Sequence, residues 1–265
     1  MPGSGHGWST VSLAGIAGPI EVHSIGDGPV VVVVPSMGRG AMDFQQVGQS
    51  LSVQGYQTVA PEPRGIGGST GSLEGISMGD LAEDLAAVIE AFGIGPATLI
   101  GHAFGNRIVR LVATLHPDLV ESIVLLACGG RVPAAPEHIA ALHKVFDITV
   151  SPEEHLAAVE TVFFAPGNDA SLWIGGWHPA VAYQQGCAVA KDDIEIWWTA
   201  GSADVLALQP LDDVIALPAN SQSVLDELGD RVSLLTVANA GHALLPEQPQ
   251  VVVGALLDWL SSRGR

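Results

Sequence analysis

The stretch LIGHAFGNRI, residues 99–108, decides the fold. Residues 97–100 form an apolar run typical of a buried strand, and residues 106–111 have the spacing of an amphipathic helix. Between them lies the pattern G-x-A-x-G, with Ala103 at its centre. Two glycines at this spacing let a strand and a helix approach closely around a strained turn, which lifts the side chain of residue 103 above the sheet. The stretch therefore predicts a strand, a sharp turn and a helix.

Strand and helix patterns alternate on both sides of this turn. Residues 9–28 resemble a β-hairpin with glycine-rich turns, and residues 30–34 are all valine, as expected for a strand buried on both faces. Residues 77–93 form the clearest amphipathic helix, which Ser77 can cap and Gly93 can end. The order of these elements predicts an α/β fold, with a mostly parallel sheet flanked by helices.

Between residues 129 and 204 this alternation stops. The stretch is rich in proline, histidine and tryptophan, and we interpret it as a helical cap inserted into a core formed by residues 1–128 and 205–265. It holds four of the six tryptophans, Trp173, Trp177, Trp197 and Trp198. These rings either line an apolar pocket or form the cap's own core, and the sequence leaves both interpretations open.

Composition excludes several classes of function. The formal net charge is −18, with only 10 Lys and Arg and no basic cluster, which argues against nucleic-acid partners and against anionic membranes. The aliphatic run 30–34 is too short to span a bilayer, and the first residues lack the pattern of a secretion signal. We therefore expect a cytoplasmic protein without a membrane partner, as a monomer or homodimer. Cys128 and Cys187 are expected to be free thiols.

The sequence predicts no metal site and no cofactor. The histidines show no spacing that groups them as zinc ligands, and there is no HExxH motif. No phosphate-binding loop appears, because the glycine-rich segments lie outside the strand–helix context that such a loop needs.

Four motifs in chain order resemble the α/β-hydrolase superfamily over roughly residues 10–262. They are the turn at 101–105, the strand and loop at 31–44, the loop VAPEPRGIGGS at 59–69, and the histidine loop NAGHALLP with its preceding acid. The resemblance implies the fold of that superfamily and an acid and a histidine that follow residue 103 in the chain. It assigns the loop at 59–69 a structural role.

The resemblance also implies which residues carry chemistry. The acid is Asp213, rather than its neighbour Asp212, and the base is His242. The carboxylate would hold the imidazole in one tautomer and stabilise its protonated form. The backbone N–H groups of Met37 and Phe104 would form the oxyanion hole, because they flank the reacting position. The pair Pro35-Ser36 replaces the His-Gly usual in this family, but backbone donors do not depend on those side chains.

Four side chains are candidate substrate contacts. Ser36 places a hydroxyl and Arg39 a cation near the site, although both could simply face solvent in a loop. Trp173 and Trp177 are candidates through the aromatic clustering of the predicted cap. With these residues we expect the substrate to be a small, largely apolar molecule.

Alanine at position 103 occupies the place of the family's serine nucleophile, so the acyl-enzyme route is closed. Three hypotheses follow. In the first, His242, oriented by Asp213, acts as a general base on water or on an acidic substrate proton. The substrate is then an ester, a lactone or another carbonyl compound, and Ser36 is a less favoured nucleophile. In the second, the chain is an esterase or lactonase whose serine has been changed to alanine by engineering. In the third, it is a binding protein that keeps the fold and has lost catalysis.

Overall fold

The centre of the molecule is a sheet of eight strands in a computed structural model that describes residues 7–93 and 95–263. The strand order is β1-β2-β4-β3-β5-β6-β7-β8. The first two strands run antiparallel to their neighbours, and every other pairing is parallel. The strands are β1 (Ser9–Ala14), β2 (Pro19–Ile25), β3 (Val30–Val34), β4 (Gln57–Pro61), β5 (Ala97–His102), β6 (Val120–Leu126), β7 (Asp204–Pro210) and β8 (Val232–Val237).

The predicted α/β class is confirmed, and so is the hairpin formed by β1 and β2. The middle strands are covered on both faces, which explains their unbroken apolar runs. All six residues of β5 are buried, and four of the five valines of β3 are buried.

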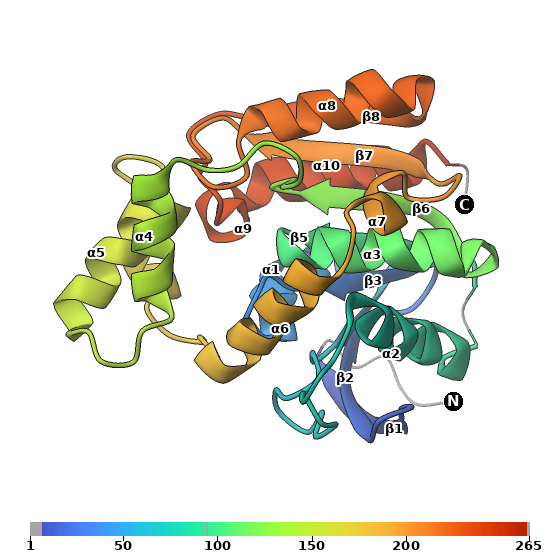
Figure 1. Cartoon of the computed structure of the whole chain (residues 1–265). Helices are drawn as coiled ribbons and strands as arrows, with labels where there is room; N and C mark the ends of the chain where they lie inside the picture. The colour runs from blue at the N-terminus through green and yellow to red at the C-terminus, as the bar shows by residue number, and fades with distance from the viewer. Residues whose placement is uncertain (1–6, 94, 264–265) are drawn as a thin grey trace.

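Helices lie on both faces of the sheet (Figure 1). Side chains of α2 and α3 pack into one apolar cluster, and those of α1 and α10 pack into another on the opposite face. The predicted helix N-cap at Ser77, which begins α2, is confirmed. The Ser77 hydroxyl accepts from the N–H of Asp80, and the Asp80 carboxylate accepts from the N–H of Ser77. The α-helices outside the segment 129–204 are α1 (Gln45–Val53), α2 (Met78–Ala91), α3 (Phe104–Leu115), α8 (Pro218–Leu228), α9 (Leu244–Glu247) and α10 (Pro249–Ser261).

The segment between β6 and β7 leaves the sheet and returns to it. Its helices are α4 (Pro136–Val145), α5 (Pro152–Phe163), α6 (Pro179–Lys191) and α7 (Glu195–Trp198). The α4–α5 pair projects beyond the edge of the sheet, and α6 crosses in front of the start of α3 (Figure 1). Trp197 and Trp198 of α7 belong to the main core cluster with α3, whereas Trp173 packs in a separate cluster with α5. The division into a core and a cap stays a prediction, and no helix in the described ranges is long and apolar enough to cross a membrane.

The turn between β5 and α3 is as strained as the sequence pattern predicts. Ala103 has φ 51° and ψ −104°, a conformation that costs a residue with a side chain about 1–3 kcal/mol. Both flanking glycines are required by space. A Cβ on Gly101 would lie 2.5 Å from the carbonyl carbon of Gly105, and a Cβ on Gly105 would overlap the carbonyl oxygen of Val34. The close packing of strand, turn and helix therefore fixes where Ala103 points.

Candidate active site

Asp213 and His242 form a hydrogen-bonded pair beyond the carboxyl ends of β7 and β8. The imidazole Nδ1 lies 2.9 Å from Oδ2 of Asp213, and the second carboxylate oxygen accepts from the backbone N–H groups of Ile215 (2.9 Å) and Ala216 (2.8 Å). The exposed fraction is 2 % for Asp213 and 7 % for His242. Since the buried carboxylate needs a donor, Nδ1 carries the proton and Nε2 is free to accept one. The adjacent Asp212 is exposed to solvent.

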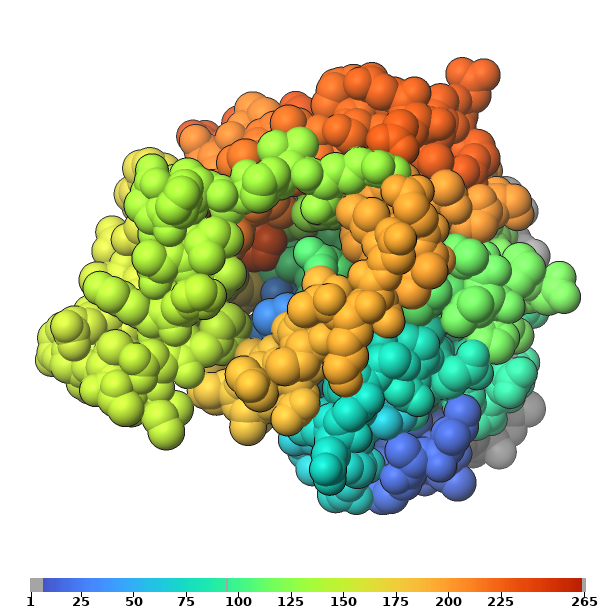
Figure 2. All heavy atoms as spheres, viewed as in Figure 1, coloured from blue at the N-terminus to red at the C-terminus, as the bar shows by residue number. Residues whose placement is uncertain are grey.

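His242 faces a cavity of about 140 Å³ at the start of α3. Figure 2 shows a hollow at this level, bordered by the segment around α4 on one side and by α6 and α7 on the other. Ala103 is half-buried at its wall. The lining is mostly apolar and consists of Ser36, Met37, Ala103, Phe104, Arg107, Ala127, Gly129, Leu142, Phe146, Phe163, Ile215, Ala216 and His242.

Two backbone donors stand beside Ala103. Phe104 is the first residue of α3, where an N–H group has no acceptor within the helix. The N–H of Met37, in the turn after β3, also has no acceptor in the described ranges. Both residues line the cavity that contains His242. The predicted members Ala103, His242, Met37 and Phe104 therefore border one space, with Asp213 behind the imidazole.

His102, which the sequence analysis passed over, fixes the backbone of His242. Its Nε2 donates to the carbonyl oxygen of His242 at 2.7 Å, and its ring lies 5.4 Å from the imidazole of His242. His102 is fully buried, and its Nδ1 has no partner in the described part of the chain. Burial, followed by the nearby charge of His242, lowers the pKa of His102 to about 3. The only signal in the sequence was a histidine next to the turn residue.

Because His102 stays neutral in the fold, it makes stability depend on pH. In the unfolded chain the pKa of His102 returns to about 6.5. Below that pH its imidazole binds a proton in the unfolded state but not in the folded state. Stability is then lost as the pH falls from about 6.5 toward about 3. When the pH is lowered from 6.5 to 4.5, the unfolding free energy of both proteins should fall. We expect this fall to be about 2–3 kcal/mol smaller in His102→Gln than in the unmodified chain, because the variant has no imidazole at this position. Urea denaturation at the two pH values measures this, and equal losses in both proteins would contradict it.

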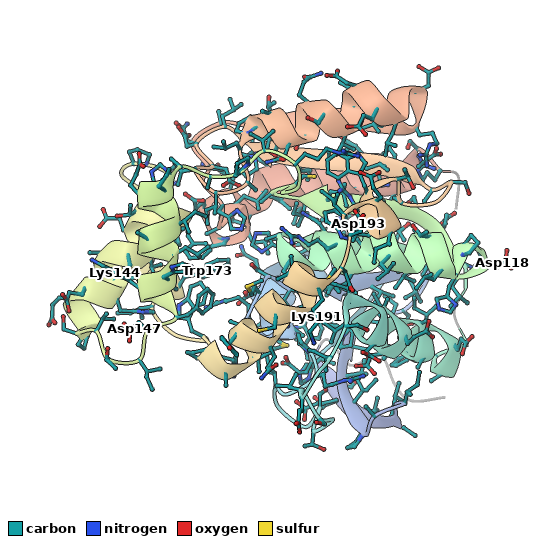
Figure 3. All side chains as sticks on the ribbon, viewed as in Figure 1. Asp118, Lys144, Asp147, Trp173, Lys191 and Asp193 are labelled. Atoms are coloured by element: carbon teal, nitrogen blue, oxygen red, sulfur yellow. The ribbon has the colours of Figure 1, made fainter. Side chains whose placement is uncertain are left out.

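Arg39, Trp173 and Trp177 do not line the cavity. The Arg39 guanidinium lies between the two indoles, 4.4 Å from the ring of Trp173 and 4.5 Å from that of Trp177. It also donates twice to the carboxylate of Asp43 and once to the carbonyl oxygen of Gly175. Trp173, labelled in Figure 3, lies beside α4 on the side that faces the core. Substrate contact stays a prediction for these three side chains, which are already occupied with one another, whereas Ser36 does line the cavity.

Arg107 is a cavity residue that the sequence analysis missed. It follows Ala103 by four residues, which is about one helical turn, so both side chains lie on the same side of α3. The spacing could have revealed it, because any long side chain one turn after the strained residue must approach the same space.

Comparison with known proteins shows which proteins the chain resembles. A family model described as alpha/beta hydrolase fold matches residues 29–147. The chain is 27 % identical over 249 residues to the protein named "Putative non-heme bromoperoxidase BpoC" of Mycobacterium tuberculosis, covering 88 % of this chain and 94 % of that protein. It is 25 % identical over 258 residues to "Putative carbamate hydrolase RutD" of Variovorax paradoxus, covering 91 % and 95 %.

Solved structures show the same architecture. The crystal structure of the BpoC protein superimposes with a TM-score of 0.80 at 25 % identity, over 94 % of this chain and 98 % of that one. An esterase from Exiguobacterium antarcticum gives a TM-score of 0.82 at 17 % identity, over 96 % and 100 %. With its sheet order, its strained turn and these similarities, the chain has the α/β-hydrolase fold.

Proposed function

We propose that the chain is a hydrolase-type enzyme in which His242 acts as a general base on water and residue 103 forms no covalent intermediate. One observation carries the proposal. His242, which is hydrogen-bonded to Asp213, borders the same cavity as Met37 and Phe104, whose backbone N–H groups have no acceptor in the described ranges, and the methyl group of Ala103. Relatives named esterase and carbamate hydrolase support hydrolysis as the class of reaction.

The reaction follows from the atoms present. Nε2 of His242 takes a proton from water while the water oxygen bonds to the substrate's carbonyl carbon. The carbonyl electron pair moves onto oxygen, and the N–H groups of Met37 and Phe104 stabilise the charge. Collapse of this intermediate breaks the bond to the leaving group, which takes the proton from the imidazolium. Because Ala103 lacks an oxygen, the space that a serine hydroxyl would fill is free for the attacking water.

The lining of the cavity supports a small, largely apolar substrate such as an ester or a lactone. Ten of the thirteen lining residues are apolar or glycine, and the volume of about 140 Å³ suits a short acyl group.

Hydrolysis of short p-nitrophenyl esters and γ-lactones, with and without a fluorophosphonate probe that labels activated serines, tests the proposal. We expect turnover without a burst phase and an unchanged intact mass. A phosphonate adduct on Ser36 would replace the proposal by a covalent mechanism. Absence of turnover across the panel would favour the binding protein, or a hydrolase that lacks only its serine.

A further inference from the structure

Arg107 is a half-buried cation without an acceptor, and it lines the candidate active site. In the described ranges its guanidinium makes no hydrogen bond and no ion pair. Its guanidinium carbon lies 5.4 Å from the ring centre of Trp197. Arg107 is therefore a charged group of the cavity that catalysis, as proposed above, does not use.

Four other arginines of the described chain are paired with carboxylates. Arg39, Arg64 and Arg263 each donate to an aspartate, and Arg131 pairs with two glutamates. These pairs show that the chain, with its 28 acidic residues, readily supplies carboxylates to its cations. Arg107 has none.

Arg110, one turn further along α3, has one hydrogen-bonded nitrogen, and its Nε and Nη1 have no hydrogen-bond partner in the described part of the chain. Arg110 is fully buried, and its guanidinium donates to the Cys128 sulfur at 2.9 Å and stacks on Trp198. Arg107 could therefore bond to the Cys128 sulfur only in competition with Arg110. Burial, and then the charge of Arg110, lower the pKa of Arg107, which is the effect of a cation held without its own counter-charge.

A guanidinium does not give up its proton in proteins, so this charge stays in the cavity wall. Leaving such a charge partly desolvated and unpaired destabilises the empty protein. An anion that enters the cavity would remove that destabilisation and form short, charge-assisted hydrogen bonds.

We propose that Arg107 binds a carboxylate of the substrate, so that the substrate combines a hydrolysable carbonyl group, an apolar segment and a carboxylate end. Only the hydrolysable carbonyl group of this substrate rests on the proposed function; the carboxylate end is inferred from Arg107 alone. A carboxylate fits because it carries one charge for one cation, and its two oxygens match one edge of the guanidinium. The apolar residues that line the same cavity as Arg107 and His242 would contact the middle of the molecule.

Binding tests the subsite without any catalysis. The probes are hexanoate and its neutral isostere hexanamide, titrated into the protein by calorimetry. We expect hexanoate to bind about 10- to 100-fold more tightly. Arg107→Gln should remove this preference and Arg107→Lys should retain part of it. Arg263→Gln, which breaks an arginine–aspartate pair outside the cavity, should leave the preference unchanged. Equal binding of the two probes, or a preference that survives in Arg107→Gln, would overturn the proposal.

Stability separates a binding role from a structural one. Loss of an unpaired charge should leave the melting temperature of Arg107→Gln equal to or above that of the unmodified chain. A marked fall would show that Arg107 is held for packing on Trp197 and would count against the subsite.

Turnover distinguishes the two proposals from each other. The substrates are the mono-p-nitrophenyl ester of glutaric acid and p-nitrophenyl pentanoate, which differ by a carboxylate at the end of a similar chain. Arg107→Gln should raise KM for the glutarate ester about 10-fold or more and leave kcat within a few-fold. If both esters are hydrolysed with equal KM, the subsite is wrong and the hydrolase stands. If neither is hydrolysed while hexanoate still binds selectively through Arg107, the subsite stands and the hydrolase mechanism is wrong.

Discussion

An Ala103→Ser variant is expected to hydrolyse p-nitrophenyl butyrate at least about 10³ times faster than the unmodified chain. Removing the serine of a serine protease lowers kcat about 2 × 10⁶-fold. The rate enhancement that is left over the uncatalysed reaction comes from substrate binding and the oxyanion hole. We propose that binding and the oxyanion hole are already in place here. The turn has φ 51° and ψ −104°, His242 lies 2.9 Å from Asp213, and the N–H groups of Met37 and Phe104 have no acceptor among the described residues. We expect a gain smaller than about 2 × 10⁶-fold because a newly introduced hydroxyl will be aligned with Nε2 of His242 for only part of the time.

The same variant is also expected to change the mechanism from general-base to covalent catalysis. Steady-state rates, burst amplitudes and intact mass after fluorophosphonate treatment should be measured side by side for the two proteins. The serine variant should show a burst and a single adduct at residue 103. If it folds normally but gains no activity and takes no adduct, the turn does not present residue 103 to His242. In that case the assignment of the site is wrong.

His242→Ala is expected to lower the ester hydrolysis of the unmodified chain by about 10²–10⁴, because general-base catalysis contributes that much. Asp213→Asn should cause a loss of similar size. Asparagine can still accept from Ile215 and Ala216, but it would present an N–H to Nδ1 of His242. The imidazole would then carry its proton on Nε2, the wrong atom for a base.

The matched control is His143→Ala, since His143 is exposed on α4 and does not line the cavity. Its rate should equal that of the unmodified chain. Full activity in His242→Ala would eliminate the general-base mechanism, whatever the behaviour of the serine variant.

The fold could be predicted because its signals are local. Two glycines around Ala103, the valines of β3 and the cap at Ser77 each determine the conformation of a few neighbouring residues. The order of acid and histidine along the chain then located Asp213 and His242, whose separation of 29 residues leaves room for one helix and one strand.

The partners of buried polar groups could not be predicted, because they depend on elements distant in sequence. His102 contacts a carbonyl 140 residues away. Arg39 resembled a substrate cation, yet it lies between two tryptophans of another segment, 136 residues from the Gly175 carbonyl that it contacts. Arg107 was missed for the opposite reason, since the absence of a partner is visible only when all neighbours are known. The sequence also suggested a single cluster for the four tryptophans of residues 129–204, but they pack in two separate apolar clusters.

The loop that holds the Met37 donor is fastened to the segment above it at several points. On the next residue, the N–H of Gly38 donates to the Gln185 side chain on α6 and its carbonyl accepts from the N–H of His178. Arg39 then contacts Gly175 and the two indoles. Any displacement of α6 or of residues 173–178 would therefore pull on the loop next to Met37. If Met37 stabilises the oxyanion as proposed above, the width to which the cavity opens and the position of this donor are coupled through these contacts.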